Sequence, residues 1–352
     1  MTARRAKNIT LVSAGLACSL LLAGCTPASE PEAQPSSVPS ATEAPAFPTT
    51  LVFDGGEVTL DSHPERVVTI GAAQTDAVLA LGTVPAGVEK AFVAPWREEA
   101  IAALGGEAPV IVTPNSYYGD IAGSALADVE ALTPDLILAG LMYCVYDCEP
   151  EPTAEFYASL DGVAPTVRPT TAAIAPEGYD SATAWREALM QAGQALGQID
   201  EAQAHLDSID ASLSDAAAAH PEFSGKTIAT VGATEGGYYV HTASAPTSAL
   251  LAELGFSPLD VSTIAFDSVN KFGSSVYLTY DQVALLDVDI ILTGADETAG
   301  SAVSKSLTAT NGVVFYAGNA EPSYWGMVQP TALSVPWALD AFVDNLADVL
   351  TR

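Results

Sequence analysis

A short pattern occurs twice in this chain: ALTPDLILAG at residues 131–140 and LLDVDIILTG at residues 285–294. Each copy has a Leu, a turn-prone pair with an Asp, a short apolar run and a closing Gly. An apolar run that ends at Gly is typical of a buried β-strand followed by a turn. The repetition predicts that two parts of the chain build the same local structure.

The two copies belong to a longer shared order of elements. Residues 66–70 predict a buried strand, and residues 75–82 predict a helix that ends at a glycine. Residues 226–232 and 247–255 repeat that strand and helix. Strands that alternate with helices predict parallel sheets covered by helices. We therefore expect an α/β fold of two similar lobes with mostly parallel central sheets; the alternative is one large α/β domain.

The segment between the halves, residues 181–217, is rich in Ala, Leu, Gln and Glu with apolar residues at helical spacing. We expect Gly193 and Gly197 to weaken this helix without ending it. A run of about 35 residues reaches roughly 50 Å, enough for one long α-helix to join both lobes. Ligands of parallel α/β sheets bind beyond the carboxyl ends of the strands, so we expect a ligand cleft between the lobes.

The beginning of the chain is predicted to be a signal peptide. Basic residues precede an apolar stretch, residues 11–24, that is too short to span a membrane as a stable helix. The stretch ends in Leu-Leu-Ala-Gly-Cys, which resembles a bacterial lipobox and implies cleavage before Cys25 and a lipid on its sulfur. The alternative is an ordinary signal peptide with an incidental cysteine. The next residues carry six prolines and predict a disordered tether. The expected organisation is signal peptide 1–24, lipidated tether 25–50, first lobe 51–178, bridging helix 179–220 and second lobe 221–352.

The composition is strongly acidic, with 12 Lys and Arg against 43 Asp and Glu and a formal charge of −31. Removal of the signal peptide takes three basic residues and no acidic one, which makes the charge −34. A nucleic-acid partner is not expected, because phosphate binding needs clustered Lys and Arg. An acidic surface is typical of solubility or of adaptation to salt.

Five segments together resemble one protein family: residues 63–88, 128–140, 248–256, 280–294 and 311–318. In this order they are similar to substrate-binding proteins of ABC importers for ferric siderophores, haem and cobalamin, over nearly all of residues 51–352. The resemblance implies two α/β lobes joined by one long helix. It also implies delivery of an iron chelate to a permease and its ATPase. With the lipobox, the expected protein is a monomer, lipid-anchored on the extracytoplasmic face of the cell membrane.

The resemblance further implies that the permease binds one carboxylate on each lobe. Asp281 occupies the second-lobe position, where relatives usually carry a Glu. Ala127 stands at the first-lobe position, so Asp128 or Glu130 would have to replace the missing acid.

Aromatic and cationic residues gather in loops expected after the strands. A flat chelate with polar edges suits aromatic walls and a few donors, and Arg offers forked donors to chelator oxygens. The candidate ligand-binding residues are Trp96, Arg97, Tyr117, Tyr118, Tyr143, Tyr146, Arg168, Tyr238, Tyr239, His241, Lys271, Tyr324 and Trp325. Among them we favour Arg97, Arg168, Tyr118 and Trp325. For each residue alone, the alternative is a packing or surface role.

Two cysteines, Cys144 and Cys148, remain once Cys18 leaves with the signal peptide and Cys25 carries lipid. Outside the cytosol such a pair most often forms a disulfide. This disulfide would be a purely structural staple, or it would stiffen a loop that presents tyrosines to the cleft. A zinc site is not expected, because no histidine lies nearby and two ligands are too few.

The expected ligand is a ferric siderophore. Because basic residues are few, a hydroxamate-type or other near-neutral or cationic complex is favoured over a triply anionic catecholate. His241 leaves a haem-binding protein as an alternative, since His can hold haem iron axially. The other histidines, His63, His205 and His220, are scattered and show no three-histidine metal site.

No enzyme is expected, and neither catalytic residues nor a cofactor are assigned. The chain has no G-x-S-x-G turn, no H-E-x-x-H and no phosphate-binding loop. Three other classes stay open: a haem- or cobalamin-binding lipoprotein of the same transporter class, a surface binder that serves no transporter, and a secreted α/β hydrolase.

Overall fold

The structure is a computed structural model. It describes residues 47–53, 56–90, 94–105, 107–113, 124–140, 150–168, 182–234, 237–259, 261, 270–272, 275–283, 286–294, 313–316 and 321–351. The described chain begins with an antiparallel hairpin of β1 (Thr49–Phe53) and β2 (Gly56–Leu60).

The first sheet has five strands in the order β5-β4-β3-β6-β7, and all of its pairings are parallel. Its strands are β3 (Val67–Ile70), β4 (Gly87–Glu89), β5 (Val110–Thr113), β6 (Leu136–Ala139) and β7 (Thr166–Val167). Helices α1 (Ala72–Ala80), α2 (Pro95–Leu104), α3 (Ser124–Ala131) and α4 (Pro150–Leu160) alternate with these strands. The central strands β3 and β6 are buried at every position, as uninterrupted apolar runs predict.

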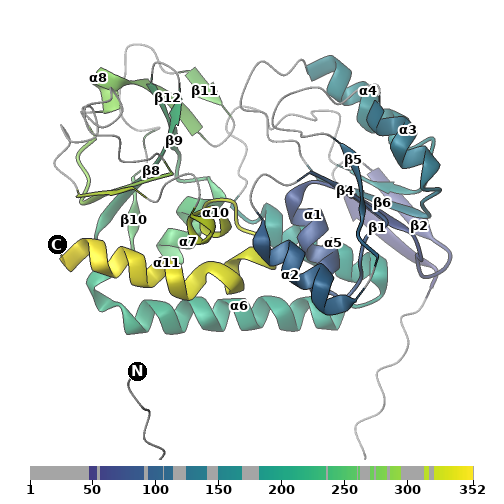
Figure 1. Ribbon diagram of the computed structural model, residues 1–352, viewed down its shortest axis with the longest axis horizontal. Helices are drawn as coiled ribbons and strands as arrows, with labels where there is room; N and C mark the ends of the chain where they lie inside the picture. Colours follow the sequence, from purple (N-terminus) through teal and green to yellow (C-terminus); the bar gives the residue numbers. More distant parts are fainter. Residues whose placement is uncertain are drawn as a thin grey trace, which may run out of the picture. The chain divides into compact units, whose positions relative to one another are not determined.

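The second sheet has seven strands and is partly antiparallel. Its parallel part consists of β8 (Thr227–Thr234), β10 (Ser257–Pro258), β13 (Ile290–Thr293) and β14 (Val313–Tyr316). An antiparallel part adds β9 (Gly237–His241), β12 (Ser275–Thr279) and β11 (Asn270–Phe272), with β9 paired to β8 on the side away from β13. Strands β8, β9 and β12 lie next to one another in Figure 1.

The Asp of the repeated pattern has the same role in both sheets. Asp135, just before β6, accepts hydrogen bonds from the backbone N–H of Glu65 (2.7 Å) and of Arg66 (2.9 Å), at the start of β3. Asp289, just before β13, accepts one from the N–H of Thr227 (2.8 Å), the first residue of β8. That hydrogen bond and one from Lys226 lower the pKa of Asp289. Each Asp therefore satisfies backbone groups that would otherwise stay unpaired where a central strand begins.

The segment between the sheets forms two helices, α5 (Ala184–Leu196) and α6 (Ile199–Ala219). The bridging helix is α6, with 21 residues, or about 31 Å at 1.5 Å per residue. The expectation that Gly197 would not end the helix is wrong, because Gly197 adopts a left-handed φ of 67° and closes α5. Only glycine adopts this conformation without steric cost, so the residue expected merely to weaken the helix is the residue that stops it.

Gly197→Ala is expected to lower the free energy of unfolding by about 1 kcal/mol, because a Cβ disfavours the left-handed conformation. Urea denaturation of the variant and the wild type measures the difference. Gly232→Ala is the control, since a Cβ there has its nearest neighbour at 3.9 Å. An equal or higher stability of Gly197→Ala would contradict this account of the helix end.

The remaining helices are η2 (Pro221–Phe223), α7 (Pro246–Glu253), α8 (Tyr280–Val283), α10 (Pro322–Val328) and α11 (Ser334–Thr351). Helix α5 packs on α1, whereas α6 packs on α11, which runs beside it in Figure 1. One hydrophobic cluster holds residues of both sheets, such as Val67 and Leu136 with Ile228 and Leu292. The two sheets therefore share a continuous core. None of the helices in the described ranges is long and apolar enough to cross a membrane.

Candidate functional site

The carboxyl ends of β3 and β6 form the centre of the candidate ligand-binding edge of the first sheet. These strands are paired in parallel, with Ile70 opposite Ala139, and each is followed by a glycine, Gly71 or Gly140. The side chain of Gln74, in the first turn of α1, lies over both glycines. Sequence reasoning missed Gln74; the signal was a glycine directly after each strand, at the edge where parallel α/β sheets bind ligands.

Trp96 and Arg97 lie in the first turn of α2 rather than in a loop, and both are 6% exposed. The indole N–H of Trp96 and the Nε of Arg97 each donate to the carboxylate of Asp76, both at 2.7 Å. Asp76 lies on α1 and is fully buried. Because both side chains are buried and bound to Asp76, the structure gives them a structural role and leaves them little surface for a ligand.

The same carboxylate reaches the second half of the chain. Thr331, just before α11, donates its hydroxyl to Asp76 at 2.6 Å and also accepts from the backbone N–H of Ser334. The ring of Trp96 lies 5.6 Å from that of Trp337 on α11. We name the four residues Asp76, Trp96, Arg97 and Thr331 the Asp76 cluster. It joins α1 and α2 to the beginning of α11.

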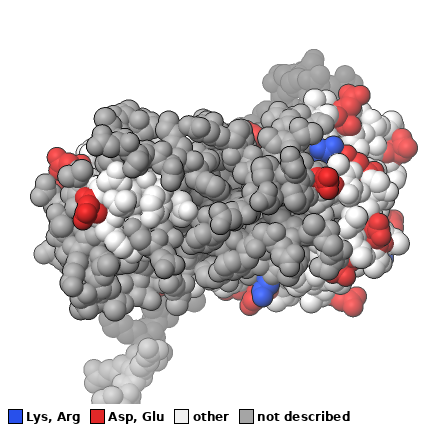
Figure 2. All heavy atoms as spheres, turned by 90° about the horizontal axis from the view of Figure 1, so that it is seen from above, with Lys and Arg blue, Asp and Glu red and all other residues white. Residues whose placement is uncertain are grey.

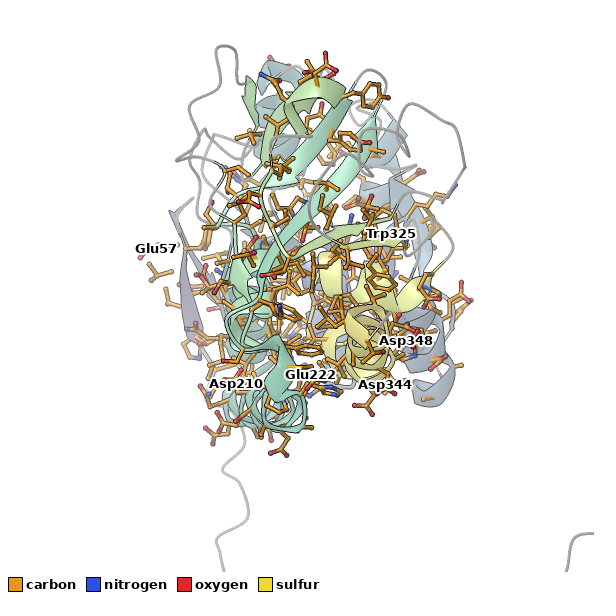
Figure 3. All side chains as sticks on the ribbon, turned by 90° about the vertical axis from the view of Figure 1, so that its left-hand side faces the viewer. Glu57, Asp210, Glu222, Trp325, Asp344 and Asp348 are labelled. Atoms are coloured by element: carbon orange, nitrogen blue, oxygen red, sulfur yellow. The ribbon has the colours of Figure 1, made fainter. Side chains whose placement is uncertain are left out.

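Arg168 directly follows β7, as expected, but its charge is already compensated. It binds Asp161 through Nε (3.0 Å to each carboxylate oxygen) and Nη2 (2.7 Å), and this pairing raises the pKa of Arg168. Both residues line a cavity of about 250 Å³ together with Glu57 and Val58 of the β1–β2 hairpin. The side chain of Glu57 is labelled in Figure 3. Arg168 stays a candidate ligand residue, although with a neutralised guanidinium.

The second-half candidates lie in regular elements instead of loops. Tyr238 is fully buried in β9, with its ring 5.4 Å from that of Tyr280, so it belongs to the core. Tyr239 is partly exposed and pairs with Tyr277 at 5.7 Å. The expectation that they lie in a strand-end loop is wrong, because β9 continues the sheet as an antiparallel strand whose side chains alternate between two faces.

His241, the last residue of β9, has a buried Nδ1 that finds no hydrogen-bond partner, although the residue as a whole is partly exposed. Its neighbour across the strands is Ser275 of β12. Burial lowers the pKa of His241 to about 4, because the charged imidazolium loses its hydration there.

His241 is therefore expected to make the fold less stable in acid. The unfolded imidazole binds a proton below its ordinary pKa of about 6.5, whereas the folded one stays neutral until about pH 4. The free energy of unfolding therefore decreases by about 1–3 kcal/mol as the pH falls from about 6.5 to about 4. Urea denaturation at pH 7 and pH 4.5 should show a smaller loss for His241→Gln than for the wild type. His63→Gln, an exposed site, is the control, and equal losses in all three proteins would refute the prediction.

Two aromatic candidates lie on α10. Tyr324 is 3% exposed and its ring covers Gly294 at the end of β13, where a Cβ would lie 2.7 Å from the ring. Trp325 is partly buried, with its ring 5.2 Å from that of Tyr324, and Figure 3 shows where it lies. Lys271 lies in β11 opposite Val276 of β12. Trp325 is the partly exposed neighbour of Tyr324, which covers the end of β13.

Several predicted residues lie outside the described ranges. They are Cys25, Tyr117, Tyr118, Tyr143, Cys144, Tyr146 and Cys148. Their roles in lipidation, ligand binding and a disulfide stay predictions. Among the residues that are described, no group of three or more His, Cys, Asp or Glu could hold a metal ion.

The acids expected to meet a permease are accessible. Asp128 and Glu130 are exposed on α3, as is Ala127, and Asp281 is exposed in the first turn of α8. Figure 2 shows one face of the molecule, where Asp and Glu clearly outnumber Lys and Arg among the described atoms. Docking itself stays a prediction.

Two helix-flanked β-sheets connected through one long helix are typical of the bilobal binding proteins. A family described as "Periplasmic binding protein" matches residues 67–307, and the chain belongs to this family. The family is one of binding proteins, so the expectations of this fold class and of a non-enzyme are confirmed. No curated protein matches the chain.

Solved structures share the fold over 86% of the chain. One is the iron uptake ABC transporter substrate-binding protein PiaA from Streptococcus pneumoniae, with 24% identity, 99% of that chain covered and a TM-score of 0.66. Another is a periplasmic solute binding protein from Mycobacterium smegmatis, with 23% identity, 98% covered and a TM-score of 0.64. SirA from Staphylococcus aureus has 20% identity, 98% covered and a TM-score of 0.56.

Proposed function

We propose that the chain captures a ferric siderophore outside the cytoplasm and delivers it to the permease of an ABC importer. The observation that carries this proposal is family membership together with a fold shared with iron-uptake proteins. Among them, PiaA has been crystallised with ferrichrome, SirA with staphyloferrin B, and BauB with acinetobactin and ferric iron.

The charges of the described site favour a hydroxamate-type or other near-neutral chelate. The fold alone does not decide this, because the catecholate-siderophore binding protein VctP from Vibrio cholerae shares it, with a TM-score of 0.52. Near the strand ends, however, Arg97 is bound to Asp76 and Arg168 to Asp161. A triply anionic chelate would have to compete with these carboxylates for the guanidinium groups, which is unfavourable in a partly dehydrated site.

The lipobox and the proline-rich tether support a lipid anchor at Cys25 on the extracytoplasmic face of the membrane. The exposed acids Asp281, Asp128 and Glu130 support docking on a permease. Haem has less support, because Nδ1 of His241 is buried without a hydrogen-bond partner that would orient the ring as an axial ligand.

Native mass spectrometry and absorbance of the chain, purified from its own culture, test this proposal. The expected result is a bound ferric chelate. It would show a visible charge-transfer band in absorbance and an added ligand mass in the native spectrum, and this added mass would disappear when the iron is reduced. A Soret band would replace the proposal with haem binding, and corrin absorbance with cobalamin binding. Hydrolysis of a chromogenic ester, abolished by a serine reagent, would make the chain a hydrolase.

A further inference from the structure

We infer that the carboxamide of Gln74 contacts the bound chelate directly, and that glycines stand at positions 71 and 140 to make room for it. The inference rests on the proposed function and adds a contact chemistry to it. A neutral carboxamide offers both N–H donors and a carbonyl acceptor. It matches the carbonyl and N–O oxygens of a hydroxamate chelate and the amide groups of its scaffold.

The position of Gln74 is set by β3 and α1. Gly71, with φ of 113°, turns the chain from the strand into the helix, and Gln74 is the third helical residue. Its carboxamide fills the space that side chains at positions 71 and 140 would occupy. A Cβ at position 71 would lie 2.5 Å from Oε1, and a Cβ at position 140 would lie 2.6 Å from Cδ and 2.8 Å from Nε2. Real Cβ atoms do not approach this closely, so the carboxamide sits over both strand ends only because both residues are glycines.

The carbonyl groups of Gly71 and Gly140 and the N–H of Gly140 have hydrogen-bond partners other than the Gln74 carboxamide. The Gly71 carbonyl accepts from the N–H (3.1 Å) and the hydroxyl (2.9 Å) of Thr75. The N–H of Gly140 donates to Ile70 at 2.7 Å, and its carbonyl accepts from the Tyr157 hydroxyl at 2.5 Å. Burial raises the pKa of Tyr157, so this hydroxyl stays protonated and keeps donating.

The hydrogen-bonding groups of Gln74 are thus left for a ligand. Within the described ranges its carboxamide has no hydrogen-bond partner, and the residue is partly exposed. It lies at the carboxyl ends of the two central strands, where ligands of parallel α/β sheets bind. Asp76, two residues further along α1, and Arg97 of α2 form an ion pair at 2.7 Å and neutralise each other. An uncharged contact of this kind suits a near-neutral chelate.

Fluorescence titration of the full chain with ferrichrome tests the inference through quenching of its tryptophans. Gln74→Ala is expected to bind ferrichrome about tenfold more weakly than the wild type, the loss typical of one hydrogen bond in a dehydrated site. Its resistance to urea should stay close to that of the wild type. Gln203→Ala is the matched control, because this exposed glutamine on α6 binds only Asp207 (2.9 Å) among the described residues, and its affinity should not change.

Gly140→Ala tests the same contact independently, because the three atoms nearest to its Cβ all belong to the flexible end of Gln74, which this Cβ would displace. We expect a similar loss of affinity, and no further loss when both substitutions are combined. Multiplying losses in the double variant would overturn the role assigned to Gly140. Wild-type affinity of Gln74→Ala, with or without a change in stability, would overturn the inference and leave the proposed function intact. If ferrichrome, ferrioxamine B and ferric enterobactin all fail to bind the wild type, the proposed function falls and the inference falls with it.

Discussion

Replacing Asp76 by Ala is expected to lower the free energy of unfolding by about 3–5 kcal/mol. The carboxylate is fully buried and accepts hydrogen bonds from Trp96, Arg97 and Thr331. Its removal leaves a buried guanidinium without a counter-charge, which costs more than the loss of the contacts themselves. Urea denaturation followed by far-UV circular dichroism measures the change.

Asp210→Ala is the matched control, because the Asp210 side chain is 55% exposed in its pair with Arg186. An exposed ion pair contributes little, so this variant should lose less than about 1 kcal/mol. If Asp76→Ala does not fold, Thr331→Val removes one hydrogen bond of the same cluster and keeps the carboxylate. The expected loss in the free energy of unfolding is about 2 kcal/mol. Equal losses for Asp76→Ala and Asp210→Ala would show that the Asp76 cluster does not hold the two halves together.

Phe223→Ala is expected to cost about 3–5 kcal/mol in the free energy of unfolding. Phe223 follows α6, is fully buried and stacks on Phe256 with ring centroids 4.5 Å apart. Truncation leaves a cavity where the long helix joins the second sheet, and a well-packed core closes such a cavity only in part. Denaturant titration gives the difference from the wild type.

Glu222→Ala, the adjacent and exposed position, serves as the control and should stay within about 0.5 kcal/mol. In Figure 3, Glu222 lies in the lower part of the molecule, as do Asp344 and Asp348 of α11. Phe223→Leu, which refills much of the volume, should recover most of the loss. A loss below about 1 kcal/mol for Phe223→Ala would mean that the exit of α6 is not anchored by this ring.

The fold was predictable wherever one local signal determined one structure. Strands β3, β6, β8 and β13 each combine an apolar run with a closing turn, and buried parallel strands require such a run. The predictions that failed have a common cause: tertiary contacts, which no local sequence pattern shows, determine the structure at those positions. Nothing local distinguishes a glycine that weakens a helix from one that ends it, as Gly197 does.

The candidate site was less predictable than the fold. Trp96 and Arg97 resembled ligand residues because aromatic and cationic side chains serve equally well in a buried network. Their partner Asp76 stands in an apolar helix, and its burial depends on Thr331, 255 residues later. Gln74 escaped notice because its importance arises from two glycines that only the folded sheet brings together.

The central proposal is that the chain binds a near-neutral ferric chelate, and isothermal titration calorimetry of the intact wild-type chain tests it most directly. The panel consists of ferrichrome, ferrioxamine B, ferric enterobactin and haemin at one ionic strength. The account predicts submicromolar binding of at least one hydroxamate complex, with one site per chain, and much weaker binding of the catecholate. Tight binding of ferric enterobactin without any binding of the hydroxamate complexes would contradict it.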